Sequence, residues 1–178
     1  MQRRIAILAF SAGALPIFAP MVMRAYAQGT ANMVPRDLGQ YKSMTLMVGS
    51  LALQSSQLAS QRASVSKVKE FAGFETAEQL TMAQVLTDTP NPAPAQLDST
   101  RAAQLQALSS APPGHAFDVQ YVALQLQGHR ELLDIQNGFL QAQPSMSSDV
   151  AHIAMLARTT IQMHLVLLEE LRQMVGET

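Results

Sequence analysis

The chain has 178 residues, and its 12 Lys and Arg against 13 Asp and Glu give it a net charge of −1 at neutral pH. It has no cysteine, which excludes disulfides, thiolate metal sites and a lipoprotein anchor. It also has no tryptophan, and its Lys and Arg do not cluster beyond the first residues. Nucleic acid and anionic lipid are therefore poor candidate partners.

The N-terminal residues have the pattern of an export signal. Arg3 and Arg4 precede an apolar run, Ile5–Met23, which two prolines interrupt, and Ala25-Tyr-Ala27 then supplies the small residues that signal peptidase requires. We therefore predict a signal peptide over residues 1–27 and a periplasmic or secreted protein, with peripheral association with the envelope left open. An uncleaved anchor is the alternative, because the apolar run is nearly long enough to span a bilayer.

Cleavage would leave about 150 residues, enough for one domain with a sizeable core. We expect a flexible segment over residues 28–38, a helical domain over residues 39–178 and no stable membrane span after processing. The protein partner is unknown, and self-association into a homo-oligomer stays open.

Four long segments carry apolar residues at spacings of three and four, the pattern of a helix with one buried face. The first covers residues 39–62 and the second residues 65–86, with Ser64 as the expected N-cap. The third begins after Pro112-Pro113, and the fourth follows an N-cap at Ser147 or Ser148. The residues expected to face inward include Met44, Val48, Leu51, Val68, Phe71, Ala72, Glu75, Met82, Tyr121, Gln125, His129, Leu132, Gln136, Ile153, Ala157, Ile161, His164, Leu168 and Leu171.

The connections between these helices are unequal. Two or three residues join the first pair and a handful join the last pair, whereas about 26 residues separate the second helix from the third and include a short helical pattern at 99–108. A long middle connection suits a crossover along the length of a bundle, since each helix is roughly 35 Å long. The order short, long, short predicts an all-α, ferritin-like four-helix bundle with an extra short helix in the crossover. An up-down-up-down bundle with the insert folded back is the alternative.

Several motifs resemble those of one bacterial family. The third helix carries Phe117-Asp118-x-x-Tyr121 followed by His129, the second opens with Val65-Ser-Lys-Val-Lys-Glu-Phe-Ala72, and the fourth carries His164-Leu165. Over about residues 42–174 the chain is similar to the family called domain of unknown function 4142. That resemblance implies a ferritin-like helical bundle of the bacterial envelope, often labelled an outer membrane protein.

The chain departs from the family at two potential metal-binding positions. The family usually has Glu where this chain has Gln54, and an Asp-His pair where this chain has Glu78-Gln79. The resemblance therefore implies a fold and a compartment more than an activity.

Helical spacing places four polar residues inward at the middle of the four helices: Gln54, Glu78, His129 and His164. We favour a buried layer without a cofactor, in which each imidazole shares its proton with a neighbouring polar side chain. The alternative is one divalent transition-metal ion, Zn²⁺ or similar, held by His129, His164 and Glu78 with Gln54 nearby and one coordination position open.

Other candidate sites are weaker. A diiron centre needs Glu-x-x-His motifs, which the chain lacks, and Glu131 and Asp134 are expected to be exposed charges. Methionines such as Met44 and Met47 are expected to fill the core rather than to bind copper.

The remaining polar candidates are expected to have no catalytic role. His115 and His152 are expected to be exposed, and Asp118 and Tyr121, together with Phe117, are expected to be structural and to fix the path of the crossover. No nucleophile motif is present. The sequence thus favours a non-enzymatic envelope, stress-related or interaction protein, with a degenerate metal-binding protein as the alternative.

The export signal gives a first prediction. The mature protein should begin at Gln28, because signal peptidase cleaves after the second small residue of Ala25-Tyr-Ala27. Intact-mass measurement on the periplasmic fraction tests it. Recovery of a mass that retains residues 1–27 from a membrane pellet would show an uncleaved anchor instead.

Overall fold

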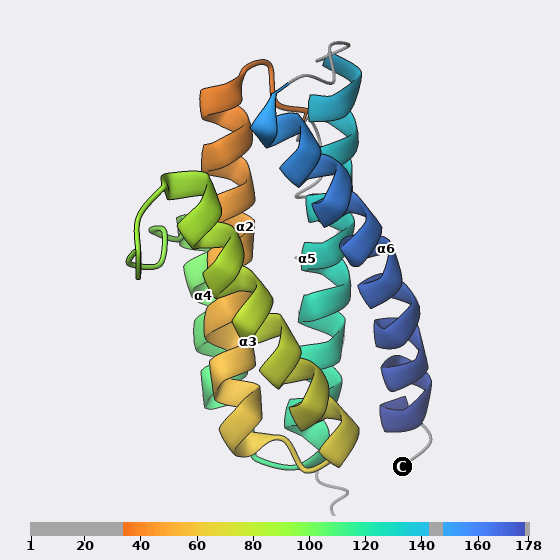
Figure 1. Ribbon diagram of the computed structural model, residues 1–178. Helices are drawn as coiled ribbons and strands as arrows, with labels where there is room; N and C mark the ends of the chain where they lie inside the picture. Colours follow the sequence, from red (N-terminus) through yellow and green to blue (C-terminus); the bar gives the residue numbers. More distant parts are fainter. Residues whose placement is uncertain (1–33, 143–147, 177–178) are drawn as a thin grey trace, which may run out of the picture. The chain divides into compact units, whose positions relative to one another are not determined.

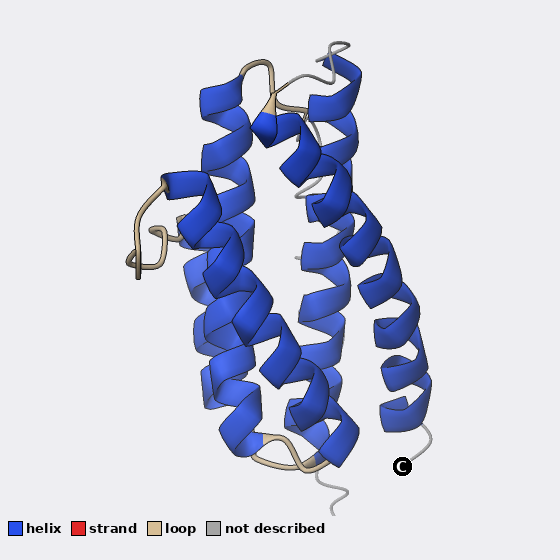
Figure 2. Ribbon diagram, in the orientation of Figure 1, coloured by secondary structure: helices blue, strands red, loops and turns tan. Residues whose placement is uncertain are grey.

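The computed structural model describes residues 34–142 and 148–176, and all regular structure in these residues is α-helical (Figure 2). The helices belong to the unit Asn32–Thr178. The predicted signal peptide and residues 28–33 of the expected flexible segment lie outside the described residues. The expected all-α class is confirmed.

Five helices occupy the described part of the chain (Figure 1): α2 Leu38–Arg62, α3 Ser66–Thr87, α4 Ser99–Ser110, α5 His115–Ala142 and α6 Asp149–Gly176. The predicted bounds of the first two long helices, 39–62 and 65–86, lie within one residue of the observed ones. The short pattern in the middle connection is the helix α4, which extends two residues further than expected.

Three helices begin with a side chain that accepts a hydrogen bond from a free backbone N–H of the first turn. Asp37 accepts from the N–H of Gln40 before α2 at 2.8 Å, and Asp98 does the same for the N–H of Arg101 before α4. The expected cap of α6 is present in Ser148, whose Oγ accepts from the N–H of Ala151 at 3.2 Å.

The helices α3 and α5 run in the same direction (Figure 1). Val65, immediately before α3, donates a hydrogen bond to Asp118 in the first turn of α5, while Leu86 near the end of α3 shares an apolar cluster with Phe139 near the end of α5. The connection that contains α4 therefore returns the chain from the end of α3 to the level of its start, as the unequal linkers predict.

The start of α3 is stabilised by Asp118, in a capping role that the sequence did not indicate. Val65 occupies the N-cap position and provides no side-chain cap. The buried carboxylate of Asp118 accepts from the backbone N–H groups of Ser64 and Val65 at 3.0 to 3.1 Å, and from the hydroxyl of Ser64. The expectation that Ser64 caps this helix is wrong, because a carboxylate from another helix satisfies the free N–H groups.

The motif of Phe117, Asp118 and Tyr121 is expected to fix the path of the crossover. In the structure it fixes the α2–α3 turn and the end of α4 instead. The hydroxyl of Tyr121 lies 2.9 Å from Oγ of Ser56 in α2. The guanidinium of Arg62 lies 4.9 Å from the centre of the Phe117 ring and donates to backbone carbonyls of residues 109 and 111 at the end of α4. The motif at the start of α5 therefore joins three helix ends.

A second contact holds α4 against α5. Arg101 of α4 donates to the carboxylate of Glu131 at 2.8 Å, and both side chains are buried. The expectation of an exposed Glu131 is wrong, because α4 covers this residue and Arg101 pairs with its charge. Asp134 is exposed, as expected.

The core consists of two apolar clusters at different levels along the helices. One includes Phe71, Phe117 and Leu168, and the other includes Leu86 and Phe139. Between them lies a level of polar side chains, described below.

The helix α6 is the one element in the described ranges that is long and apolar enough to cross a membrane, by length and composition alone. A core helix passes the same test, and α6 does bury one face at positions three and four residues apart: Ala151, Ala154, Ala157, Ile161, His164, Leu168, Leu171 and Val175. The expectation of no stable membrane span after processing stays a prediction.

The capping role of Asp118 is testable by substitution. Asp118→Ala should lower the free energy of unfolding by about 2–3 kcal/mol, because buried N–H donors lose a charged acceptor. Chemical denaturation of the two proteins measures the difference. Asp134→Ala on the exposed side of α5 is the matched control and should stay within about 0.5 kcal/mol; equal effects of the two substitutions would contradict the assignment.

Candidate metal centre

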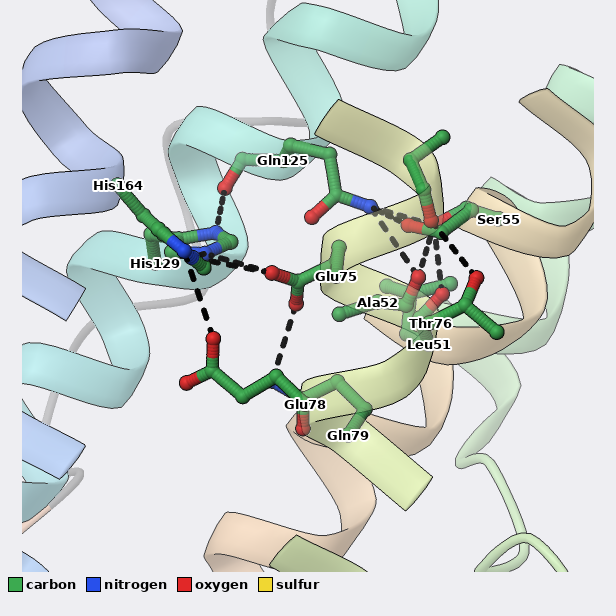
Figure 3. A network of polar contacts seen from close by, with 12 residues as sticks. Leu51, Ala52, Ser55, Glu75, Thr76, Glu78, Gln79, Gln125, His129 and His164 are labelled. Carbon is green, nitrogen blue, oxygen red and sulfur yellow. Dashed lines mark hydrogen bonds and ion pairs between the residues drawn. The ribbon is translucent and has the colours of Figure 1, made fainter. Parts of the chain in front are cut away.

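Three buried side chains from three helices meet at the polar level of the core (Figure 3). Glu75 of α3 is 0% exposed, His129 of α5 is 1% exposed and His164 of α6 is 7% exposed. Oε2 of Glu75 lies 3.3 Å from Nε2 of His129 and 3.2 Å from Nδ1 of His164, and these two nitrogens are 3.2 Å apart. One atom from each residue therefore stands at the corner of a nearly equilateral triangle.

Of the four polar residues singled out in the sequence, the structure brings the two histidines together. The carboxylate between them differs from the predicted one. His129 and His164 meet, whereas Glu75 rather than Glu78 lies between them. Glu78 contacts the outer nitrogen of His164, Nε2, at 3.4 Å. Gln54 donates to Ser50 on its own helix instead of facing the histidines.

The sequence contained a signal for Glu75. It lies four residues after Phe71 and three after Ala72, so it continues the buried stripe of α3. Glu78 lies further around the helix, on the side that faces α6, and its side chain keeps 22% of its exposure. The family resemblance drew attention to positions 78 and 79, which here support the cluster from outside.

A backbone carbonyl sets the tautomer of His129. Nδ1 of this ring lies 2.8 Å from the carbonyl oxygen of Gln125, which can only accept a hydrogen bond. Nδ1 therefore carries a proton, and in the neutral ring the lone pair of Nε2 points toward Glu75 and His164. Metal-binding histidines are commonly oriented in this way.

A second residue orients the carboxylate. Nε2 of Gln79 donates to Oε1 of Glu75 at 3.0 Å, which leaves Oε2 facing the imidazoles with no other hydrogen-bond partner. Space for Gln79 comes from Gly49 of α2, where an added Cβ would lie 2.3 Å from Oε1 of the glutamine. An added Cβ would therefore displace the amide of Gln79 from its present position.

Apolar groups cover the remaining side of the cluster. The ring of Phe71 lies one helical turn before Glu75, with its centre 5.2 Å from that of His164 and 6.0 Å from that of His129. The partly exposed carboxylate of Glu78 lies on the other side. Among these polar side chains, Glu78 on the α3–α6 side is the most exposed.

Charge pairing dominates the protonation of the cluster. Burial alone would raise the pKa of Glu75, but the charges and hydrogen bonds of His129 and His164 outweigh it and lower that pKa to about 2. Burial alone would lower the pKa of His129, yet the charge and hydrogen bond of Glu75 raise it above its usual 6.5. The pKa of Glu78 is raised by its burial and by the charge of Glu75.

The arrangement suits two states. Without a cation, a proton on an imidazole can be shared with the carboxylate of Glu75. With both imidazoles neutral, the same three atoms, which lie within 4.8 Å of one another, are the two-histidine, one-carboxylate set that binds Zn²⁺ or Fe²⁺ and leaves a position open. Two carboxylates, Glu75 and Glu78, are too few for a ferritin-type diiron centre.

Fold and cluster define an all-helical protein with a buried histidine–carboxylate centre. The chain belongs to the family described as "Domain of unknown function (DUF4142)", whose family model matches residues 24–171. Neither the curated proteins nor the solved structures contain a significant match to this chain.

The pKa shifts predict how the metal-free protein responds to pH. The lowered pKa of Glu75 contributes stability that is present above its usual 4.5 and is lost as the pH falls toward about 2. The raised pKa of His129 contributes stability that is present below 6.5 and is lost as the pH rises through the raised value. The contribution of the cluster should therefore be largest between about pH 4.5 and 6.5.

This profile is measured by chemical denaturation in the presence of a chelator at pH values from about 3 to 9. The range extends roughly two units beyond the usual pKa values of Glu and His. His129→Gln should remove the decline on the alkaline side, whereas the exposed His152→Gln should leave it unchanged. A cluster contribution that keeps growing from neutral to alkaline pH would contradict the pairing.

Proposed function

We propose that this protein binds one divalent transition-metal ion between Glu75, His129 and His164. The observation that carries the proposal is the convergence of one carboxylate oxygen and two imidazole nitrogens from three helices in a buried site. Two neutral imidazoles and one carboxylate give the site a charge of −1, which a divalent cation reverses to +1 without burying a multiply charged group.

The surrounding hydrogen bonds support the same proposal. Gln125 and Gln79 each hold one ligand by the atom that a metal would not use. Glu78 can accept from Nε2 of His164 while Nδ1 faces the centre, the carboxylate–histidine–metal arrangement. Each of the three ligands thus has a partner that orients it.

We further propose that the fold is a ferritin-like four-helix bundle and that the protein acts in the bacterial envelope after export. The parallel course of α3 and α5 and the long connection through α4 support the bundle. The basic and apolar N-terminal residues followed by Ala25-Tyr-Ala27 support export. A periplasmic protein without cysteine that holds its ion with His and Glu suits binding or scavenging of a metal rather than redox chemistry of a thiol.

A second candidate function is an interaction role at the envelope. On α6 the side chains of Met163, Val166 and Leu167 are exposed by 58%, 61% and 45%. Their spacing of three and four residues puts them on one face of the helix, and an apolar face of this kind favours contact with another surface.

Metal titration of the protein after treatment with a chelator tests the main proposal. Zn²⁺ or Co²⁺ at a hundredfold excess over Kd should raise the free energy of unfolding by about 2.7 kcal/mol. Glu75→Gln, His129→Gln and His164→Gln should each abolish most of this metal-dependent increase.

Matched controls come from the same helices. Glu70→Gln on the exposed side of α3 and His152→Gln on α6 should keep the full increase. If the wild-type protein gains no stability from any divalent transition metal, or if the three site variants gain as much as the controls, the cluster is a structural hydrogen-bonded layer.

A further inference from the structure

A recess lies between α3 and α6, beside the cluster of Glu75, His129 and His164; Glu78, which contacts His164, lies in its wall. Its volume is about 430 Å³, within the range of small-molecule pockets. Residues 77–85 of α3 form one wall and residues 153–160 of α6 form the other. The two helices make few close approaches to each other, whereas α2 packs along α3 and α5 packs along α6.

Most of the recess is apolar, and part of that apolar surface is exposed. Met82 and Ile153 contribute to its inner part. Val85 and Leu156 line it with 48% and 71% of their surface exposed. An apolar molecule in the recess would remove this surface from water, which is favourable in proportion to the area covered.

The polar side chains of the recess are all hydrogen-bond acceptors. The hydroxyl of Thr81 donates its hydrogen to the carbonyl of Ala77 at 2.9 Å, and that of Thr160 donates to the carbonyl of Leu156 at 3.2 Å. Their oxygen lone pairs are left for a ligand. The third polar group is the carboxylate of Glu78, which has no hydrogen to donate when ionised.

We infer that the recess binds a small apolar amine, with its ammonium group against Glu78 and its apolar body between Val85 and Leu156. A ligand that fits must bring hydrogen-bond donors, because the side chains of the recess supply acceptors, and a positive charge complements the one carboxylate. An alcohol brings one donor without charge, and a carboxylate ligand would be repelled.

The position of Glu78 explains why a small molecule fits better than a second copy of the chain. The carboxylate is recessed, with 22% of the side chain exposed, and one of its oxygens faces His164 (Figure 3). A narrow ammonium group therefore reaches this partly covered carboxylate more readily than a broad protein surface does. The contact of Glu78 with His164 uses Oε2, which leaves Oε1 for the ammonium group. The amine site therefore requires no metal ion.

A matched series of ligands tests the inference: 2-phenylethylamine, 2-phenylethanol and phenylacetate share one apolar body and differ in the polar group. Isothermal titration calorimetry of the metal-free full chain at neutral pH should give saturable binding of the amine, at least tenfold tighter than of the alcohol, and none of the acid. Glu78→Gln should reduce the affinity for the amine to that of the alcohol. Ala77→Phe, which fills the recess from an exposed position, should abolish both.

Glu70→Gln is the control, because this glutamate lies on the same helix, outside the recess, and pairs with Lys67. It should bind the amine like the wild-type protein. Equal affinities for amine and alcohol, or an amine affinity unchanged in both Glu78→Gln and Ala77→Phe, would overturn the inference. A wild-type protein that binds no amine but is a dimer separated by Ala77→Phe would show that a second copy covers the recess, which would also overturn it.

Discussion

The buried carboxylate of Glu75 is the constraint on which the rest of the polar core depends. An ionised carboxylate in a protein interior is costly unless it is paired and hydrogen-bonded. Here two imidazoles face one of its oxygens and Gln79 binds the other, while Gly49 on α2 leaves room for that glutamine. The charge of Glu75 therefore determines which side chains the four long helices can place around it.

The capping contact of Asp118 fixes the position of that level. Asp118 joins the start of α5 to Val65, immediately before α3. Along two helices that run in the same direction, ten residues lead from Val65 to Glu75 and 11 from Asp118 to His129, which corresponds to about 15 and 16 Å of rise. The contact at the helix starts thus places Glu75 beside His129, so the motif at the start of α5 supports the centre without touching it.

Helical periodicity and linker length were sufficient to predict the helices, the direction of α5 and the burial of His129 and His164, because these follow from spacing within one segment. The errors concern contacts between segments. The cap of α3 comes from Asp118, Glu131 is buried by Arg101 from α4, and Glu75 replaces Glu78 because a rotation of one helix by a fraction of a turn decides which glutamate faces inward. The apolar stripe that includes Phe71 indicates this rotation, because Glu75 continues that stripe and Glu78 does not.

The central claim is that the three side chains form a metal site, and anomalous diffraction from crystals grown with one equivalent of Co²⁺ or Zn²⁺ tests it most directly. We expect a single anomalous peak about 2.0–2.2 Å from Oε2 of Glu75, Nε2 of His129 and Nδ1 of His164. A well-ordered cluster with no peak at that position, while the three side chains keep their mutual hydrogen bonds, would contradict the account.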